Sequence, residues 1–457
     1  MKKIDLTKGK VLSVLTTLAL PIMGSSFLQF AYGLIDMFWV GGLGSSAVAS
    51  IGSSSFFLGL GYSINALVVT GTGIKVSHEV GRKNEIETED YIRNGLIMNF
   101  LIGLIYALIL VVFGKGFIGF LNLNDPLVER DSYIYLAVSA PVLFFSFFNY
   151  LFTRILASFG NNKLALKISA TGIILNMILD PILIYTFKLG VFGAAVATLL
   201  ANILMFFMYI YYGKGIFKID LKKKVNYKKV REIARLGFPM ASQRVLFTLV
   251  NIILARIIAS FGADAIAAQK IGLQIESVSF MVIGGLNGAI AGFTGQNYGA
   301  KKLNRVNEGY KKALLLGAIY SILVSALFIC IPGLLVGLFV KDEATIIIGS
   351  SYLRVLGIVQ IFSSFEMISN GVFSGLGLPK IPSAISIIFT MLRIPMALVL
   401  VKFLGINGVW WSIAISNILK GSTSCIIYAF GKNTRDFNHG MNCHDIYQKY
   451  KPYNTCK

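Results

Sequence analysis

Long runs of apolar residues, separated by short polar segments, fill the chain from residue 11 to residue 430. Each run is long enough to cross hydrocarbon, because a transmembrane helix needs about 20 mostly apolar residues. The runs predict twelve transmembrane helices, at residues 11–40, 46–75, 91–119, 131–158, 164–188, 190–213, 231–260, 263–294, 308–339, 345–375, 381–403 and 406–430. The fold class that we expect is therefore an all-α polytopic membrane protein.

The composition agrees with this pattern and excludes other classes of protein. Of the 457 residues, 55% are hydrophobic and 14% are charged, whereas an ordinary soluble domain has about 25% charged residues. This balance excludes a disordered chain and an ordinary soluble globule. The 4 cysteines are too few for a disulfide framework. Nothing in the sequence indicates redox chemistry, and we expect no cofactor.

The positions of the basic residues orient the predicted helices. Twelve crossings put both termini on one side, and 31 of the 42 Lys and Arg residues lie on that side, 5 lie on the other side and 6 lie within helices. Basic loops stay in the cytoplasm. We therefore expect a multi-pass protein of the cell membrane with both termini cytoplasmic. The net charge of +21 then indicates contact with membrane lipids rather than with nucleic acid.

The sequence contains an internal repeat. A shift of 218 residues places Pro21 on Pro239, Gly44 on Gly262 and Gly81 on Gly299. Each copy holds six helices, so the two copies share one orientation and relate by an axis along the membrane normal. We expect two pseudo-symmetric six-helix bundles around a central cleft: an N-terminal lobe at 1–213, a basic cytoplasmic linker at 214–230, a C-terminal lobe at 231–430 and a cytoplasmic tail at 431–457. We expect the chain to be a monomer.

Four acidic residues fall well inside predicted helices, namely Asp36, Asp180, Glu276 and Glu366. An ionisable group at membrane depth costs about 2.5 to 3.5 kcal/mol on insertion scales, so such groups usually face a polar cavity and serve a function. Three amides and one hydroxyl lie on the same helix faces as the two aspartates or at similar depths in the membrane: Gln29, Asn149, Asn176 and Thr198. We expect these oxygen-rich groups to meet in the N-terminal lobe.

Oxygen ligands without His or Cys suit H⁺ or a hard cation such as Na⁺, and they disfavour zinc or copper. Asp36 and Asp180 are therefore candidate ligands of a coupling Na⁺ or carriers of H⁺, with Asn149, Asn176 and Thr198 in support. The alternative is that the two aspartates are hydrogen-bonded structural groups near Pro181. We expect no basic residue in the core of this lobe.

The acids of the C-terminal lobe have two interpretations. Arg and Lys residues on helices of the same lobe could neutralise Glu276 and Glu366 in structural ion pairs. Alternatively, these glutamates present negative charge to a cationic substrate in the cleft. On the second interpretation Gln29, Glu276 and Glu366 belong to the substrate cavity.

Several short motifs resemble the multidrug and toxic compound extrusion (MATE) family of secondary transporters. They are Leu20-Pro21 with Asp36, Asn176-x-x-x-Asp180-Pro181, Gly193-Ala194-Ala195-x-Ala197-Thr198, Gly295-Gln296-Asn297-x-Gly299-Ala300, Gly375-x-Gly377 and Arg393-Ile394-Pro395. The resemblance covers residues 11–430. It implies an efflux antiporter of two six-helix bundles that exports small organic cations in exchange for inward H⁺ or Na⁺.

The resemblance also assigns residues. It implies that the coupling ion binds a polar network at Asp36, Asn149, Asn176, Asp180 and Thr198. Members with a second acidic pair place it on helices seven and ten. This chain has Glu366 on the tenth predicted helix, but the interior of the seventh carries only Arg244 and Arg256 as charged residues.

Three other functions compete with that of an antiporter. A lipid or polysaccharide flippase of the same superfamily needs a cavity lined by Arg and Lys. Arg244, Arg256 and Arg393 could line such a cavity, so a flippase stays an alternative. A channel needs a continuous polar filter. An enzyme needs nucleophilic or basic groups within the helices, and none of the 3 His residues lies in a predicted span, since His78 is expected in a loop. We therefore expect a transporter and not an enzyme.

Overall fold

The protein folds into long helices, seen in a computed structural model that describes residues 5–121, 126–217 and 224–431. The part of the predicted linker at 218–223 and the predicted tail beyond Gly431 lie outside the described residues. The helices are α1 (Val11–Gly41), α2 (Ser45–Arg82), α3 (Glu85–Phe120), α4 (Pro126–Ser158), α5 (Asn162–Pro181), η1 (Ile182–Thr186), α6 (Gly190–Gly213), α7 (Tyr227–Ala259), α8 (Ala263–Gly299), α9 (Leu303–Cys330), α10 (Pro332–Gly337), α11 (Glu343–Gly375), α12 (Lys380–Met391), α13 (Arg393–Leu404) and α14 (Asn407–Gly431).

Twelve helical spans within the described residues are long and apolar enough to cross a membrane. The π-helical segment η1 continues α5, and α12 and α13 together form one span. The prediction of an all-α protein with twelve transmembrane helices is confirmed. The chain therefore forms a multi-pass membrane protein.

Several helices extend beyond the apolar runs that predicted them. The second predicted span ends at residue 75, whereas α2 continues to Arg82. Helix α3 begins six residues before its predicted start, where the Asn84 side chain accepts a hydrogen bond from the Glu87 N–H. An apolar run shows which part of a helix lies in the hydrocarbon of the membrane. Backbone hydrogen bonds and capping side chains extend the helix beyond that part. The expectation of a loop around His78 is therefore wrong, because His78 lies in the last turns of α2 and is buried.

Helix α11 shows the same capping at the opposite end of the molecule. The Asp342 carboxylate accepts a hydrogen bond from the Thr345 backbone N–H at 2.8 Å. This bond lowers the pKa of Asp342 below its usual range. The charged cap stabilises the helix N-terminus, where unpaired N–H groups carry partial positive charge.

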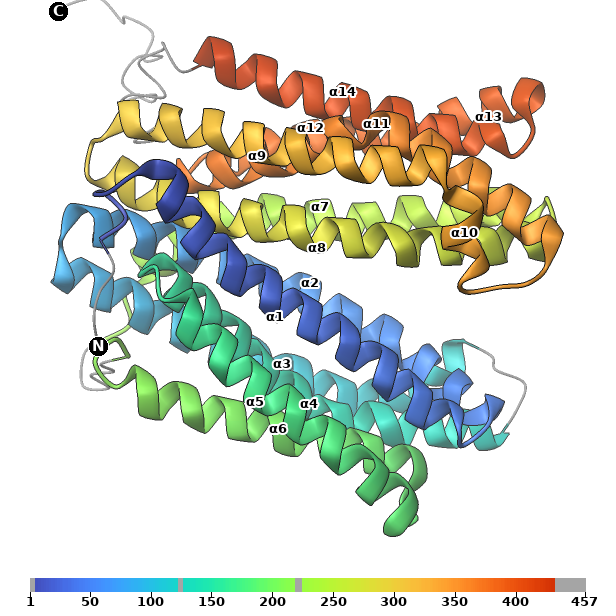
Figure 1. The fold of residues 1–457 in the computed structure, drawn as a ribbon. Coiled ribbons are helices and arrows are strands. Elements are labelled where there is room, and N and C mark those ends of the chain that lie inside the picture. The colour runs from blue at the N-terminus through green and yellow to red at the C-terminus, as the bar shows by residue number, and fades with distance from the viewer. Residues whose placement is uncertain (1–4, 122–125, 218–223, 432–457) are drawn as a thin grey trace, which may run out of the picture.

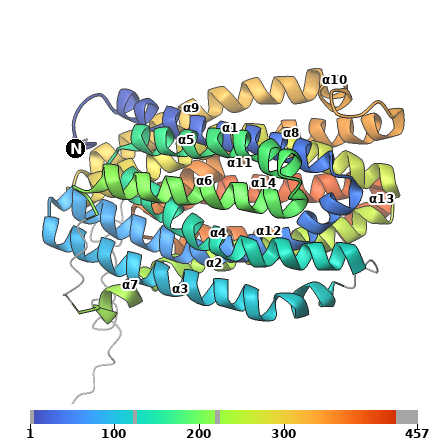
Figure 2. The same cartoon turned by 90° about the horizontal axis from the view of Figure 1, so that it is seen from below.

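The helices form two groups, which we call the N-lobe (α1 to α6) and the C-lobe (α7 to α14). Figure 1 shows them one above the other, with the start of α1 and the end of α14 at the same end of the molecule. We call this the terminal end and the opposite one the distal end. Figure 2 shows α1 of the N-lobe close to α8 of the C-lobe, and Gly285 of α8 packs directly against Met23 of α1.

The internal repeat is visible in the backbone. Gly44 and Gly262, which precede α2 and α8, have φ angles of 104° and 102°. Lys83 and Lys301, which follow the same two helices, both have φ of 60°. All four positions are related by the shift of 218 residues. Equivalent turns therefore begin and end the same helix in each lobe, as expected for two pseudo-symmetric bundles.

The two lobes cross at the terminal end through reciprocal glycine contacts. A Cβ on Gly81 of α2 would collide with the backbone oxygen of Gln296 on α8, and a Cβ on Gly299 would collide with that of His78. Gly81 and Gly299 are equivalent in the repeat, and so are His78 and Gln296. Only glycine permits this close approach of backbones.

Hydrogen bonds and ion pairs also join the lobes at the terminal end. His78 Nε2 donates to the Gly375 carbonyl oxygen at 2.6 Å, and Gln296 Nε2 donates to the Ser158 carbonyl at 2.8 Å. Lys229 at the start of α7 forms ion pairs of 2.9 Å with both Glu87 and Asp90 of α3. The structure therefore holds the lobes together at the terminal end.

Candidate functional site

Asp180 lies at the end of α5, where the helix changes its hydrogen-bonding pattern. Pro181 has no N–H, and the next five residues form the π-helical segment η1. The Asp180 carboxylate is fully buried. Its Oδ1 accepts a hydrogen bond from Asn176 Nδ2 at 3.1 Å, and its Oδ2 has no hydrogen-bond partner among the described residues. A buried carboxylate with an unpaired oxygen is unfavourable unless a proton or a cation binds there.

Asp36 approaches Asp180 from α1. Its side chain is partly buried, and its charge acts directly on Asp180. Both carboxylates act on Tyr32, one turn before Asp36 on α1. The Tyr32 hydroxyl lies 3.4 Å from the hydroxyl of Thr198 on α6. The structure thus brings together Asp36, Asp180, Asn176 and Thr198, which were predicted to meet, and adds Tyr32.

Asn149 belongs to a neighbouring cluster rather than to the acid pair. Its Nδ2 donates to the Asn202 carbonyl oxygen at 3.0 Å and to Asn202 Oδ1 at 3.1 Å. Ser146 donates to the same Oδ1 at 2.8 Å, and Asn202 Nδ2 donates to the Thr198 carbonyl. Asn202 therefore links Asn149 on α4 with Thr198 on α6. Sequence reasoning missed Asn202, although an amide one turn after Thr198 was a visible signal.

A cavity of about 530 Å³ opens beside these groups. Its polar and aromatic lining residues are Ser25, Ser26, Gln29, Tyr32, Tyr62, Ser146, Asn149, Tyr150, Thr153, Arg154, Asn162, Ser169, Asn176, Thr198, Asn202, Tyr209 and Arg244. Almost all belong to the N-lobe, and Arg244 and Gly288 come from the C-lobe. The volume suits a drug-sized molecule. Asp36 and Asp180 are not part of the lining, whereas Asn176, which binds Asp180, and Tyr32, on which both acids act, belong to it.

The charged residues that line this cavity differ from those that the sequence predicts. Two guanidinium groups, Arg154 of α4 and Arg244 of α7, line the cavity together with no carboxylate. The expectation of an N-lobe core without basic residues is wrong. Arg154 lies in the last turns of α4, within the span predicted at 131–158, but it was counted with the basic residues of the terminal side. The side chain of Arg154 lies against Gly73 of α2, where any Cβ would collide with it.

Gln29, which the sequence assigns to the substrate cavity, lines this cavity, and its Nε2 donates to the Tyr150 hydroxyl at 3.1 Å. The two glutamates grouped with it lie elsewhere. Lys420 Nζ is 3.3 Å from Glu366 Oε2, and both side chains are buried in the C-lobe. The Tyr352 hydroxyl donates to Glu276 Oε2 at 3.0 Å. Neither glutamate is part of the cavity lining.

Glu366 therefore shows the ion-paired arrangement that the sequence left open, whereas Glu276 is hydrogen-bonded to Tyr352. Arg393 completes the group, because its charge acts on both Glu276 and Glu366. Its guanidinium donates to Ser416 at 3.0 Å and to Asn417 at 2.8 Å. Sequence reasoning missed Lys420, the direct partner of Glu366.

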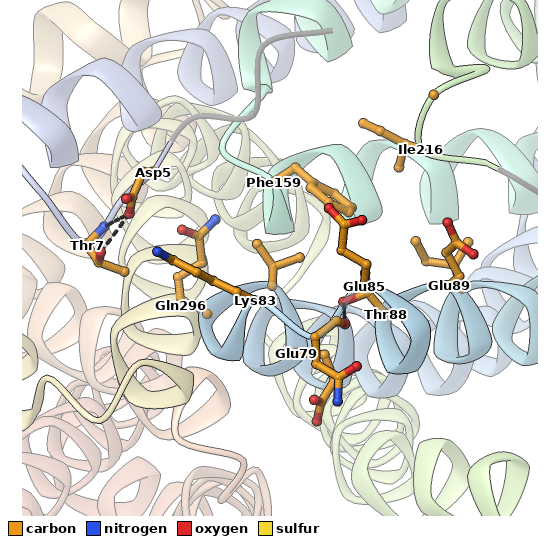
Figure 3. Close-up of a pocket in the computed structure, with 15 residues that line it drawn as sticks. Asp5, Thr7, Glu79, Lys83, Glu85, Thr88, Glu89, Phe159, Ile216 and Gln296 are labelled. Carbon is orange, nitrogen blue, oxygen red and sulfur yellow. Dashed lines mark hydrogen bonds between the residues drawn. The ribbon is translucent and has the colours of Figure 1, made fainter.

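A second cavity of about 310 Å³ lies at the terminal end, between the segment before α1, the α2–α3 turn and α8. Figure 3 shows Asp5, Glu79, Glu85 and Glu89 around it, with Lys83. Asp5 accepts hydrogen bonds from the Thr7 hydroxyl at 2.6 Å and the Thr7 N–H at 2.9 Å, and the hydroxyl bond lowers the pKa of Asp5. Glu79 is paired with Arg82 at 2.6 Å.

Metal-ion chemistry is restricted by the side chains that meet. Within the described ranges, no group of three or more His, Cys, Asp or Glu side chains is placed to hold a metal ion. A cation at the acid pair would therefore have two carboxylates, Asp36 and Asp180, and neutral oxygens such as that of Thr198. Such a set suits a monovalent hard cation better than zinc.

A repeated twelve-span fold with a drug-sized cavity and a buried acid pair defines a membrane transporter. The MatE family model matches residues 21–182 and 239–399, one segment in each repeat. The chain belongs to the MatE family.

Two curated relatives match most of the chain. A probable multidrug resistance protein NorM of Thermotoga maritima is 25% identical over 436 residues, covering 92% of each chain. The multidrug export protein MepA of Staphylococcus aureus is 26% identical over 444 residues, covering 92% of this chain and 94% of its own length.

Two solved structures share the fold. A MOP superfamily transporter from Pyrococcus furiosus, described as having a binding pocket of reverse polarity, aligns with a TM-score of 0.89 at 22% identity, over 96% of this chain and 99% of its own. An outward-facing multidrug resistance MATE family transporter aligns with a TM-score of 0.88 at 22% identity, over 94% and 98%.

Proposed function

We propose that the protein is a multidrug efflux antiporter that exports organic cations in exchange for inward H⁺ or Na⁺. The single observation that carries this proposal is the buried carboxylate of Asp180, whose Oδ2 lacks a partner and whose neighbour is a second acid, Asp36. The names of the two relatives, a probable multidrug resistance protein and a multidrug export protein, support the substrate range.

The exchange works by competition between ion and cargo. Two nearby carboxylates attract a cation and resist joint ionisation, so one H⁺ or Na⁺ relieves their repulsion. Tyr32, on which both acids act, and Thr198 line the cavity, and a change of charge at the acids alters the hydrogen bonds of both. The cargo in the cavity is then released. A cation that moves inward gains about 2.3 kcal/mol per 100 mV, whereas a tenfold cargo gradient costs about 1.4 kcal/mol.

The proposal includes the location of the protein and its orientation in the membrane. We place the protein in the cell membrane, with both termini cytoplasmic, acting as a monomer without a cofactor. In that orientation the glycine crossing and the His78 bond close the cytoplasmic side. The acid pair then lies toward the outer face, because Asp36 is near the distal end of α1. H⁺ or Na⁺ would enter from that side.

The test is efflux of ethidium from energised vesicles that contain the purified protein. The wild type should export ethidium under an imposed H⁺ or Na⁺ gradient, and a protonophore should abolish the H⁺-driven part. Asp36→Asn should abolish export. The matched control is Asp264→Asn, which removes an exposed carboxylate at the start of α8. Full export by Asp36→Asn would refute the proposal.

A second candidate function is a lipid or polysaccharide flippase of the same superfamily. Arg154 and Arg244 on the cavity favour it, because an anionic headgroup needs basic partners. A flippase would translocate labelled anionic lipid without an ion gradient and would not export ethidium.

A further inference from the structure

The segment before α1, residues 5–10, crosses to the other lobe, and we call it the strap. Its most buried residue is Leu6, which is 1% exposed. Leu6 belongs to one apolar cluster with Phe293 of α8 and Tyr310 of α9. Leu6 is therefore buried with residues of the C-lobe, although the strap leads into α1 of the N-lobe.

Both backbone polar groups of Leu6 bind the C-lobe. Its N–H donates to Gln296 Oε1 at 3.1 Å. Its carbonyl oxygen accepts from Asn297 Nδ2 at 3.2 Å and from a guanidinium N–H of Arg305 at 3.4 Å. Gln296 and Asn297 belong to α8, and Arg305 belongs to α9. One residue of the strap is thus bonded to two helices of the other lobe.

Cationic side chains of the C-lobe bind the rest of the strap. The Arg305 guanidinium also donates to the Lys8 carbonyl oxygen at 2.7 Å. Lys302 Nζ donates to the Thr7 carbonyl oxygen at 2.9 Å and to the Thr7 hydroxyl at 3.2 Å. Hydrogen bonds from charged donors are stronger than neutral ones. Lys8 and Lys302 are exposed, so water can replace these bonds when the strap leaves. The strap can therefore dock and release reversibly.

The internal repeat gives the C-lobe a matching crossing. Lys224, which the shift of 218 residues places on Leu6, accepts a hydrogen bond at its carbonyl oxygen from Arg93 of α3 at 3.0 Å. Two residues later, Asn226 donates its N–H to Asn94 Oδ1 at 2.9 Å. The start of each lobe is therefore bonded to the third helix of the other lobe, α3 or α9.

The strap also covers the junction of the lobes. Asp5, Thr7 and Gln296 line the cavity of about 310 Å³ at the terminal end, and Figure 3 shows all three beside it. The backbone oxygen of Gln296 is the atom against which Gly81 packs in the glycine crossing. The terminal ends of α1 and α8 cannot separate while Leu6 stays bonded to Gln296.

We propose that the strap keeps the terminal end closed while it is docked, and that it must leave α8 and α9 before that end opens. Docking buries one leucine side chain, which favours the docked state. The hydrogen bonds of the strap add to this preference and fix its position. The inference goes beyond the proposed function, because it concerns the movement of the lobes and not the cargo or the ion.

The test measures the labelling of single cysteines in the purified full chain in lipid nanodiscs, where a maleimide reaches both ends. Each variant also lacks the four native cysteines. Ser77→Cys reports the terminal end, where Ser77 is buried against Gly295. Ser277→Cys reports the cavity between α1 and α8, on the distal side of the glycine crossing. No cargo or ion gradient is needed, so a failure of antiport leaves this test unaffected.

Leu6→Ala should speed the labelling of position 77 by about tenfold or more and slow that of position 277, because the distal side closes as the terminal end opens. Tenfold corresponds to about 1.4 kcal/mol, less than the truncation of a buried leucine to alanine typically costs. The matched control Leu12→Ala truncates a leucine of α1 that is 43% exposed and should change neither rate. An unchanged rate at position 277 would show a loosening confined to the strap and would overturn the proposal, as would an unchanged rate at position 77.

Lys302→Gln keeps the test decisive if Leu6→Ala does not yield a monodisperse protein. It removes the charge that binds Thr7 but no buried group, since Lys302 is exposed. Labelling should become severalfold faster at position 77 and slower at position 277. Lys311→Gln removes an exposed lysine about two and a half turns farther along α9 and should change neither rate. Equal rates for the two lysine variants would then overturn the proposal.

Discussion

The buried carboxylate of Asp180 combines an energetic cost with a candidate function. One oxygen is bound to Asn176 and the other has no described partner. A charged carboxylate that is buried with one unpaired oxygen lowers the stability of the fold. Residues that lower stability in this way are common at functional sites.

We therefore expect Asp180→Asn to be more stable than the wild type. Asparagine keeps the shape and removes the charge that burial penalises. The melting temperature of the purified variant should rise, while its ion-driven ethidium efflux should be lost. Asp264→Asn should change neither property. A melting temperature of Asp180→Asn well below that of the wild type would show that the carboxylate is a structural group.

The Glu366–Lys420 pair should behave in the opposite way. Lys420→Met leaves Glu366 buried and unpaired, which typically costs about 3 to 5 kcal/mol. The variant should unfold at a clearly lower temperature. The double variant Glu366→Gln with Lys420→Met should recover most of that loss, because no buried charge remains. Equal stability of the single and double variants would contradict the ion pair at 3.3 Å.

The acids were predictable and several of their neighbours were not. A charge inside an apolar run is visible in a single sequence, so Asp36 and Asp180 could be selected. His78 was expected in a loop because the apolar run of α2 stops before it. Arg154 lies near the end of the span predicted at 131–158 and was counted with the basic residues of the terminal side. Lys420 lies within α14, and a sequence does not show that this helix faces Glu366 on α11.

Close helix crossings were the least predictable feature of the elements. Apolar runs predicted all twelve spans, and the repeat predicted that Gly81 and Gly299 are equivalent. That each packs against the backbone of the other lobe depends on the tertiary structure. The internal repeat does not show which surface Gly81 or Gly299 contacts.

Gly81→Val should therefore weaken the junction of the lobes. Its side chain would collide with the Gln296 backbone, and overpacking of this kind typically costs about 1 to 3 kcal/mol. We expect a lower melting temperature and a more open terminal end. Gly59→Val is the control, because a Cβ at Gly59 meets nothing within 4 Å. Equal melting temperatures for the two variants would contradict the crossing.

The two lobes together form a molecule that is joined at the terminal end. A smaller cavity of about 430 Å³ lies between α1 and α8, lined by Ser26, Gln29, Phe30, Ser277, Phe280 and Met281. On α8 its lining residues lie farther toward the distal end than Gly299 of the glycine crossing. We infer that this interface is reached from the distal end.

Labelling of cysteines tests this arrangement. In a variant without Cys330, Cys425, Cys443 and Cys456, a Ser277→Cys substitution should react with a membrane-impermeant maleimide added from the distal side. Ser77→Cys should not, because Ser77 is buried and packed against Gly295 at the crossing. Faster labelling of position 77 than of position 277 would show that the lobes open at the terminal end instead.

Exchange of cargo for cation is the central claim, and counterflow measures it directly. Vesicles that contain the protein are loaded with a pH or Na⁺ indicator, without any ion gradient, and an ethidium gradient is then imposed. Ethidium that moves down its gradient should drive H⁺ or Na⁺ in the opposite direction, and Asp180→Asn should abolish that ion movement. Ethidium movement through the wild-type protein without any opposite flux of H⁺ or Na⁺ would contradict the claim.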